Sequence, residues 1–409
     1  MNTKNKQSNN LPNLRFPGFE GEWERKKLGD IAKITKGVGI PKSQLSEHGL
    51  PCILYGELYT KYKSEIISEV FSLTNLNTKK LVKSKSNDVL IPSSGETAID
   101  ISTARYVPYD NILLGGDLNI IRLKNGNGLF FSYQLNGKRK LDIAKIAQGI
   151  SVVHLYADKL KKLDIYYPKI AEQKKISTFI SLIDKRIQTQ MKIIEGLEKL
   201  IKGLQEQIFS QKLRFKDENG NKFAGWEDYL LSEILIKNSE RNKRLKYANI
   251  QSVSNKYGFI NQEKLFEDRR IASKNTSNYY IIRKGVFAYN PSRIDVGSLA
   301  YKFDDNTSII SPLYISFWVD QAYIVDEFLL NWFMTQYFTI QINNLFEGSV
   351  RNTLSFESFG KVKINLPSIE EQKAIANFLS SINQRIDNER QLLTQYQNQK
   401  KFLLQNLFI

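Results

Sequence analysis

Residue types that build covalent and metal sites are scarce in this chain of 409 residues, which has one cysteine, Cys52, and two histidines, His48 and His154. A single cysteine excludes an internal disulfide and a multi-cysteine zinc site, and two histidines leave little for a metal centre or a Ser-His-Asp triad. No apolar run approaches the ~18 residues that span a bilayer, and residues 1–13 lack the apolar core of a signal peptide. These absences predict a cytoplasmic protein that holds no metal.

Acidic residues are also few compared with basic ones. The chain has 59 Lys and Arg against 42 Asp and Glu, a net charge of +17. Such a surplus predicts a polyanionic partner, and nucleic acid is favoured over a membrane surface because no basic amphipathic helix is evident. The two long helices predicted below carry only +3 between them, so about +14 of the +17 lies in the globular parts. A basic surface that merely aids solubility is the alternative.

The chain repeats itself at an offset of about 199 residues. Between 168–187 and 367–386, 11 of 20 residues are identical without a gap. The match also wraps around, because the Leu-Arg-Phe segment at 213–215 corresponds to the one at 14–16. The repeat is therefore cyclic, and each copy consists of a globular part followed by a long helix.

Two long helices are predicted, over 171–210 and 370–409. Pro168 and Pro367 end the preceding strands, and acidic residues at each helix start suit the positive end of the helix dipole. Five heptads in each helix indicate a coiled coil, with a polar residue at the third a position of both. The a positions are Ile176, Ile183, Gln190, Leu197 and Leu204, then Ile375, Ile382, Glu389, Tyr396 and Leu403. The d positions are Ile180, Ile187, Ile194, Ile201 and Ile208, then Leu379, Ile386, Leu393, Lys400 and Leu407.

The cyclic order also predicts how the helices pair. The first helix leads from the first globular part to the second, and the second must lead back, because Phe408 corresponds to Phe209 just before a globular part. Only an antiparallel pair closes this circuit. The predicted fold is therefore α+β, with two pseudo-symmetric globular domains separated by two long helices that form an antiparallel coiled coil. Gln190 and Glu389 are expected in neighbouring layers beside the pseudo-two-fold axis.

The sequence pattern of the globular parts is typical of α+β domains with irregular sheets. Short β-type runs at 88–91 and 118–123 lie between turn residues, and the second part has strands at 285–289 and 313–319 and a helix at 325–333. The predicted divisions are a disordered tail (1–13), a first domain (14–167), a central helical spacer (168–212), a second domain (213–366) and a C-terminal helical spacer (367–409). Outside the boundary motifs the two domains match poorly, which predicts that they bind different versions of one target.

Two motifs suggest catalysis only superficially. The glycines of 36–42 lack the Gly-Lys-Ser/Thr ending of a phosphate-binding loop. The segment 289–293 partly resembles the Asn-Pro-Pro-aromatic motif of adenine methyltransferases, but Ser292 and Arg293 stand in place of the second proline and the aromatic residue. No glycine-rich strand-to-helix turn for a methyl donor precedes it. The sequence therefore predicts no catalytic site.

The same segments suit the reading of DNA. Asn pairs with adenine, Arg pairs with guanine, and small hydroxyls reach phosphates or base edges. The loop at 92–97 corresponds to 289–293, and matched loops precede each helix at 148–151 and 347–352. Ordinary solvated turns are the alternative. The predicted DNA-binding residues are Lys36, Ser93, Ser94, Arg105, Gln148, Ser151, Tyr289, Asn290, Ser292, Arg293, Ser349, Arg351 and Asn352.

A boundary motif and two opening segments carry a family resemblance. Pro-x-x-x-Glu-Gln-x-x-Ile occurs at 168–176 and 367–375, each time opening a long helix, while GEWERKKLGDIAKI and AGWEDYLLSEIL open the globular parts. In these features the chain resembles the specificity subunit of a type I restriction-modification system, over nearly its whole length after the tail. The polar residues at 389, 396 and 400 of the second helix depart from the apolar heptad pattern.

The resemblance implies a non-catalytic subunit in which each globular part is a target-recognition domain that reads one half of a bipartite double-stranded DNA target. It implies two modification (methyltransferase) subunits that methylate adenine, and restriction (translocase/endonuclease) subunits that cleave. S-adenosylmethionine, ATP and Mg would belong to those partners, with no cofactor in this chain. The alternatives are a self-contained DNA adenine methyltransferase or nuclease with unrecognised motifs and, third, a purely structural coiled-coil scaffold.

Overall fold

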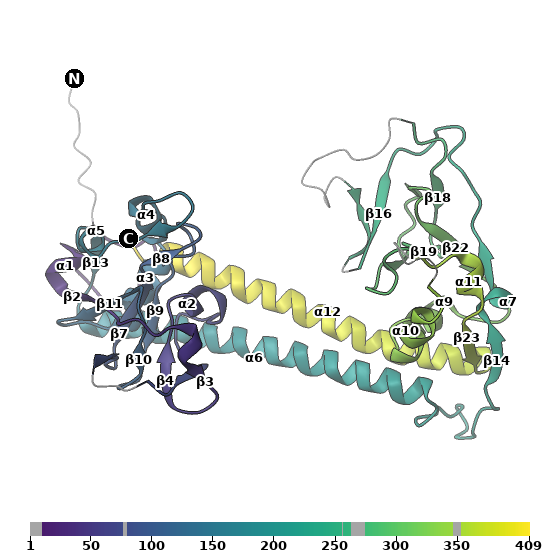
Figure 1. Cartoon of the computed structure of the whole chain (residues 1–409), viewed down its shortest axis with the longest axis horizontal. Helices are drawn as coiled ribbons and strands as arrows, with labels where there is room; N and C mark the ends of the chain where they lie inside the picture. Colours follow the sequence, from purple (N-terminus) through teal and green to yellow (C-terminus); the bar gives the residue numbers. More distant parts are fainter. Residues whose placement is uncertain (1–9, 77–79, 256, 263–274, 347–352) are drawn as a thin grey trace. The chain divides into compact units, whose positions relative to one another are not determined.

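The computed structural model describes residues 10–76, 80–255, 257–262, 275–346 and 353–409, which form two compact units (Figure 1). One unit is made from the described part of Met1–Lys192 together with Gln391–Ile409, and the other from that of Ile193–Arg390. Each unit contains a globular head and one segment from each of two long helices, α6 (Ile170–Phe209) and α12 (Ile369–Asn406). We call the head before α6 head 1 and the head before α12 head 2.

Head 1 is built on a four-stranded antiparallel sheet in the order β2-β11-β7-β9 and a five-stranded sheet in the order β3-β5-β4-β10-β6. Two-stranded pairs β1-β13 and β8-β12 complete it. Its strands are β1 (Glu24–Lys27), β2 (Ala32–Lys36), β3 (Leu45–Ser46), β4 (Leu50–Ile53), β5 (Ser72–Thr74), β6 (Val82–Lys83), β7 (Asp88–Pro92), β8 (Ser94–Gly95), β9 (Arg105–Val107), β10 (Leu113–Leu114), β11 (Leu118–Leu123), β12 (Val153–His154) and β13 (Asp164–Tyr167). Its helices are α1 (Leu28–Ile31), α2 (Glu57–Thr60), α3 (Gly128–Asn136), α4 (Lys140–Ile146) and α5 (Ala157–Lys161), with a 3-10 turn at Lys42–Gln44.

Head 2 repeats this plan. Its sheet β15-β22-β19-β20 has the strand order of β2-β11-β7-β9, the pair β14-β23 matches β1-β13, and a second sheet has the order β17-β16-β21-β18. Its strands are β14 (Glu227–Leu230), β15 (Leu235–Lys237), β16 (Ile250–Ser254), β17 (Gly258–Asn261), β18 (Tyr280–Ile282), β19 (Phe287–Tyr289), β20 (Leu299–Tyr301), β21 (Ser308–Ile310), β22 (Ile315–Val319) and β23 (Lys363–Leu366). Its helices are α7 (Leu231–Ile234), α9 (Asp326–Trp332), α10 (Gln336–Asn343) and α11 (Phe356–Gly360). The shared topology confirms the predicted pair of pseudo-symmetric α+β domains.

The predicted elements are confirmed with small shifts in their ends. The run at 88–91 is β7, whose five residues are all buried, and the run at 118–123 is β11. In head 2 the predicted strand from 285 begins only at Phe287, because Gly285 has a positive φ of 90° and Val286 closes a turn onto Arg283. Pro168 and Pro367 directly follow β13 and β23, as predicted.

The glutamate of the repeated boundary motif joins each helix to its head. In head 1 the carboxylate of Glu172 accepts hydrogen bonds from Arg15 at 2.9 and 2.8 Å and from the indole of Trp23 at 3.3 Å. In head 2, Glu371 accepts from Arg214 at 2.8 Å through both oxygens and from the indole of a tryptophan at 3.2 Å. Both carboxylates are almost fully buried. This paired contact is the physical reason for a Glu at that place in both motifs.

The glutamine of the motif makes a second repeated contact. The side-chain oxygen of Gln173 accepts from the backbone N–H of Asn127, the residue before α3, and its amide donates to the carbonyl of Pro168. Gln372 accepts in the same way from Val325, the residue before α9, and donates to the carbonyl of Pro367. Each glutamine therefore ties the first turn of a long helix to the start of a helix in its head.

The end of α12 closes the first unit. The backbone N–H of Leu14 donates to the carbonyl of Asn406 at 2.9 Å, and at the equivalent place in the other unit Leu213 donates to Gln207 at 3.0 Å. α12 ends three residues before the predicted position 409, because Phe408 leaves the helix and is buried against Phe130 of head 1. Within the first unit, Leu14 at the start of head 1 thus meets the end of α12, as the cyclic repeat predicts.

The predicted tail is shorter than expected. Residues 1–9 lie outside the described residues, but 10–13 are held in place: the carbonyl of Asn10 accepts from the N–H of Trp23 at 2.9 Å, and the amide of Asn13 donates to Asn406 at 3.2 Å. The prediction of disorder over 1–13 is therefore wrong for its last four residues. One backbone and one side-chain hydrogen bond to ordered segments hold them.

Burial along α6 and α12 follows the heptad. Every a and d position is buried or half-buried, including the polar Gln190 and Glu389. In the first unit Asp184 bonds Lys400 and Arg186 lies over Tyr396, while in the second Glu198 bonds Arg390. Within the first unit, residue numbers increase along α6 while those of the contacting residues in α12 decrease, so the two helix segments there run antiparallel. The proximity of Gln190 to Glu389 stays a prediction, because these residues belong to different units.

No helix in the described part of the chain combines the length and the apolar character that a membrane crossing requires.

Candidate nucleic-acid interface

One edge of the main sheet in head 1 gathers most of the predicted loop residues. β2 and β7 both run antiparallel to β11, so the ends of β2 and β7 lie beside the start of β11. Lys36 is the last residue of β2, and Ser93 follows β7 directly. The N–H of Ser93 donates to the carbonyl of Asp117, and the N–H of Gly37 donates to that of Leu118. Sheet topology therefore brings the 36–39 and 93–95 segments together.

The loop that precedes α5 is attached to the same edge. β12 pairs with β8, and the backbones of Gln148 and His154 exchange hydrogen bonds of 2.9 and 2.7 Å. The N–H of Leu155 donates to the carbonyl of Ser93, and the ring Nδ1 of His154 lies 3.1 Å from the hydroxyl of Ser94. Gln148 and Ser151 are exposed, as is Lys36. Three predicted contacts thus share one accessible rim.

Head 2 has an equivalent edge after β19. The side-chain oxygen of Asn290 accepts from the N–H of Ser292 at 3.1 Å, and its backbone carbonyl accepts from Arg293 at 3.0 Å, which shapes a tight turn. Ser292 and Arg293 are exposed, and Asn290 is half-buried. The N–H of Leu354 donates to the carbonyl of Pro291, just as Leu155 donates to Ser93 in head 1. The two loops are therefore equivalent in position although their sequences differ.

Several predicted contacts are instead part of the framework. Arg105 is 8% exposed, its guanidinium donates to the carbonyls of Leu58 and Tyr62 at 2.9 and 2.7 Å, and burial lowers its pKa. Tyr289 is fully buried, its hydroxyl donates to the carbonyl of Leu354, and burial raises its pKa. Ser93 and Ser94 are also buried. Because these groups face the interior, they are removed from the expected contact set.

Three predicted residues, Ser349, Arg351 and Asn352, lie outside the described residues. One residue at the head 1 edge was not among the predicted DNA contacts: His154, half-buried, with its ring 6.1 Å from that of Tyr156. Its place six residues after Gln148 was a usable signal, because a short loop that returns to a sheet brings its two ends together.

Over the described ranges there is no group of three or more His, Cys, Asp or Glu side chains placed to hold a metal ion. The thiol of Cys52 is buried, and burial, with Glu57 nearby, raises its pKa to about 11, so it stays protonated and unreactive at neutral pH. Gly37 is a packing residue, because a Cβ there would lie 1.9 Å from the carbonyl oxygen of Gly115. Residues 37–41 form an irregular segment rather than the ordinary turn expected there, and the N–H of Val38 donates to the carbonyl of Leu114.

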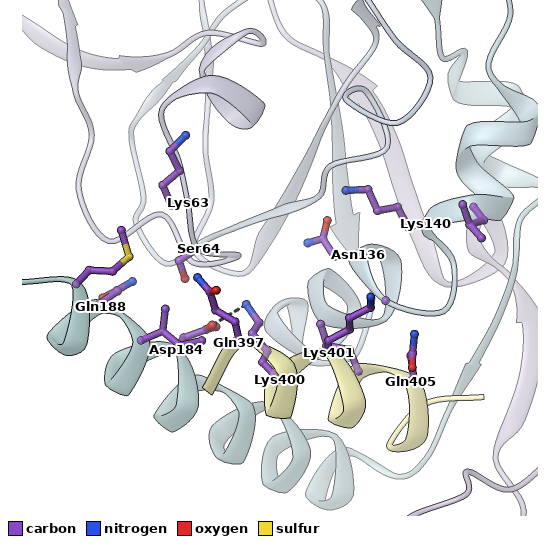
Figure 2. A pocket seen from close by; sticks show the side chains of 15 residues that line it. Lys63, Ser64, Asn136, Lys140, Asp184, Gln188, Gln397, Lys400, Lys401 and Gln405 are labelled. Atoms are coloured by element: carbon purple, nitrogen blue, oxygen red, sulfur yellow. Dashed lines mark ion pairs between the residues drawn. The ribbon is translucent and has the colours of Figure 1, made fainter. Parts of the chain in front are cut away.

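A cavity of about 650 Å³ lies within the first unit between head 1, α6 and α12 (Figure 2). The ammonium of Lys400 lies at one wall, 2.6 Å from Asp184, and also pairs with Glu65. The hydroxyl of Tyr133 donates to Asp184 at 2.5 Å. Burial, with repulsion from Glu65, raises the pKa of Asp184, while the two carboxylates hold the pKa of Lys400 above its ordinary value against the effect of burial. These charges satisfy one another, which indicates a structural cluster.

Comparison with known proteins gives a consistent picture. A family model described as the type I restriction modification DNA specificity domain matches residues 20–199 and 224–397. The chain is 26% identical to the type I restriction enzyme MjaVIII specificity subunit of Methanocaldococcus jannaschii, over 96% of this chain and 92% of the relative. It is 30% identical to a putative type I restriction enzyme specificity subunit of Haemophilus influenzae, over 42% of each.

Two solved structures share the fold. The S subunit of a type I restriction-modification system from M. genitalium superposes with a TM-score of 0.62 at 16% identity, covering 98% of this chain and 99% of that one. A chain from a structure described as the basis of complex assembly and conformational transition of the type I R-M system superposes with a TM-score of 0.55 at 15% identity, over 97% and 99%.

Proposed function

This chain belongs to the family of type I restriction-modification DNA specificity proteins, and from that premise we propose that its two heads each read one half of a bipartite DNA sequence. The chain is the DNA-recognition subunit of such a system. The observation that carries the two-reader proposal is the pair of equivalent sheet edges, whose frames repeat while their exposed residues differ. The proposed contacts are Lys36, Gln148, Ser151, Asn290, Ser292 and Arg293, together with Ser349, Arg351 and Asn352.

The chemistry belongs to partners in this proposal. Two modification subunits would use S-adenosylmethionine to methylate adenine in the target, and restriction subunits would use ATP and Mg to translocate and cleave. This chain would supply recognition without catalysis. A cytoplasmic location likewise stays a prediction. The family match and the similar specificity subunits support this role over the alternative, a self-contained methyltransferase or nuclease.

Methylation mapping tests the proposal. Genomic DNA from cells that carry this chain with its modification subunit should show one methylated adenine motif made of two short sequences separated by unread base pairs. Replacing 14–167 with the head of a relative should change one half-sequence and leave the other intact. If both halves changed, the two-reader model would be wrong, and DNA methylation by the purified chain alone would establish the alternative.

Two arginines provide a matched test of the contact set. Arg293→Ala should weaken binding to the target by about 10- to 100-fold without lowering the melting temperature, because an exposed arginine that contacts a base is worth about 1–3 kcal/mol. Arg105→Ala should instead lower the melting temperature, because it leaves two interior carbonyls without donors. Equal melting temperatures for both variants, measured by calorimetry, would contradict the assignment of Arg105 to the framework.

A further inference from the structure

An apolar side chain stands almost fully in solvent at the head 1 edge. Ile150 is 98% exposed, and Val152, two residues on, is 54% exposed. They form the tip of the loop between Gln148 and His154, whose backbones pair with each other. An isolated exposed isoleucine is unremarkable on a protein surface, but this one lies within the rim that carries the proposed contacts Gln148 and Ser151.

The loop presents this tip in a defined shape. Gly149 has a φ of 123°, and a Cβ at that position would lie 2.1 Å from the carbonyl oxygen of Val152. The loop folds so tightly there that only glycine fits. β12 then joins it to β8 through Val153 and His154. The exposure of Ile150 therefore results from a closed turn anchored to the sheet.

Nothing in the described part of the first unit covers Ile150. Only a binding partner could therefore bury its side chain. Burial would be favourable, since removing apolar surface from water drives association. The composition of the loop itself favours DNA over protein: along the chain no acidic residue lies between Asp142 and Asp158, and the flanking Gln148 and Ser151 offer hydrogen-bonding groups. Across the sheet, the exposed Glu96 follows Gly95, the partner of Val153. Base edges offer an apolar surface to such a tip, either as the thymine methyl group or as the face of an unstacked base.

Resting on the proposed function, we propose that Ile150 is a specificity residue of head 1 that makes an apolar contact with a base in one half of the target. Gly149 and the β8-β12 pairing orient it, and the polar neighbours beside it bind base edges or phosphates. This contact adds sequence discrimination without adding charge. It differs from the charged contacts Lys36 and Arg293 because its contribution does not depend on the release of counterions from DNA.

The test compares full-length variants bound to their modification subunits. Fluorescence anisotropy would measure the Kd of wild type, Ile150→Ala, Ile150→Leu and Leu141→Ala for the mapped target duplex and for a scrambled duplex, over a range of salt. Leu141 is the matched control, an exposed apolar residue of the same head at 64% exposure. Ile150→Ala should weaken target binding by about 10- to 100-fold, leave scrambled-duplex binding unchanged, and keep the slope of log K against log salt, because no phosphate contact is lost.

Ile150→Leu and Leu141→Ala should behave like wild type, and all variants should melt at the same temperature because the changed side chains are exposed. Two further arms identify the contact. If Ile150 touches a thymine methyl group, replacing thymine with uracil in that half-site should weaken DNA binding by wild type and not by Ile150→Ala. If Ile150 instead unstacks a base, the fluorescence of 2-aminopurine placed in that half-site should increase on binding of wild type and not of Ile150→Ala.

Each of the following outcomes would overturn the inference. Wild-type affinity of Ile150→Ala for the target would show that the residue makes no contact with a base, and an equal loss of affinity for both duplexes would assign it a structural role. Normal DNA binding with weakened assembly would assign it to a protein contact. A wild-type complex with no preference for the mapped target would overturn the proposed function as well, so the two failures are distinguishable.

Discussion

At the scale of single residues, the repeated motif is explained by what its side chains hold. Glu172 and Glu371 each neutralise an arginine and accept from an indole inside a head. A buried carboxylate with three donors is well satisfied, but its partners depend on it. The motif therefore marks the attachment of head to helix, and its conservation between the two copies needs no role in DNA binding.

Glu172→Gln should lower the free energy of unfolding of the first unit by about 2–4 kcal/mol, because removal of the charge leaves Arg15, at 18% side-chain exposure, without its buried partner. Chemical denaturation followed by tryptophan fluorescence would measure the change. Glu195→Gln is the control: Glu195 pairs with Lys199 at 63% and 76% exposure, and its loss should change stability by less than about 0.5 kcal/mol. Similar effects of the two variants would contradict the assigned role.

Asp164 predicts a pH dependence. Its hydrogen bonds to Arg25 at 3.0 Å and Lys27 at 2.8 Å across the β1-β13 pair lower the pKa of its carboxyl below the ordinary value of 3.8. A lowered folded pKa means that the stabilisation is present above pH 3.8 and is lost as the pH falls through the folded pKa.

Asp164→Asn should therefore reduce stability by about 0.5–1 kcal/mol at pH 6 and by progressively less below pH 4. Melting temperatures of wild type and variant across pH 2 to 7 would show the two curves converging in acid. In the background of Arg25→Ala with Lys27→Ala, the same substitution should have little further effect. Parallel curves at all pH values would contradict the assignment.

At the scale of elements, α6 and α12 follow one heptad but differ where Lys400 stands. Its counterpart at the repeat offset is Ile201, and the counterpart of Asp184 is Asn383. The ionic cluster of Lys400, Asp184, Glu65 and Tyr133 is thus a feature of the first unit that the repeat does not copy. Polar groups within an apolar seam generally set pairing at some expense of stability.

Lys400→Met should lower the stability of the first unit by about 3–5 kcal/mol, because Asp184 and Glu65 would be left as buried, unpaired carboxylates. The triple variant Glu65→Gln, Asp184→Asn, Lys400→Ile should recover most of that loss. Urea denaturation of wild type, single and triple variants would measure this. A triple variant less stable than Lys400→Met would show that the charges stabilise in another way.

At the scale of the whole molecule, α6 is one unbroken helix of 40 residues and α12 one of 38. A continuous helix lengthens by about 1.5 Å for each added residue. If these helices measure the distance between the two half-sequences, their length should appear in the DNA target. Insertion of whole heptads would lengthen both helices and keep the a and d positions of the pair in register.

Inserting one heptad into each helix, at matched positions, should add about 10 Å and keep the a and d pattern in register. Because B-DNA rises about 3.4 Å per base pair, the spacer of the methylated motif should grow by two or three base pairs while both half-sequences stay the same. Methylation mapping of cells carrying the variant provides the readout, and insertion into α6 alone, which breaks the pairing register, is the control. An unchanged spacer would show that the helices do not set the distance.

Much of this architecture follows from local pattern in the sequence. Heptad periodicity, the prolines before each helix and the cyclic repeat depend on residues close in the chain or on simple duplication, so they predicted the two helices, their antiparallel course within the first unit and the two α+β heads. The loop segments around Ser93 and Gln148 were also predicted as neighbours in function. Tertiary structure decided which of their side chains reach solvent.

Arg105 and Tyr289 were predicted to contact DNA because arginine and tyrosine can bind bases, yet both side chains point inward and donate to carbonyls of distant segments. Ile150 was not among the predicted contacts of the loop 148–151, yet the tight turn at Gly149 leaves it 98% exposed. The cluster at Lys400 likewise needed Glu65, which is 335 residues away in the chain. Direction and burial depend on long-range packing, which sequence periodicity does not carry, so these assignments belonged to the folded molecule alone.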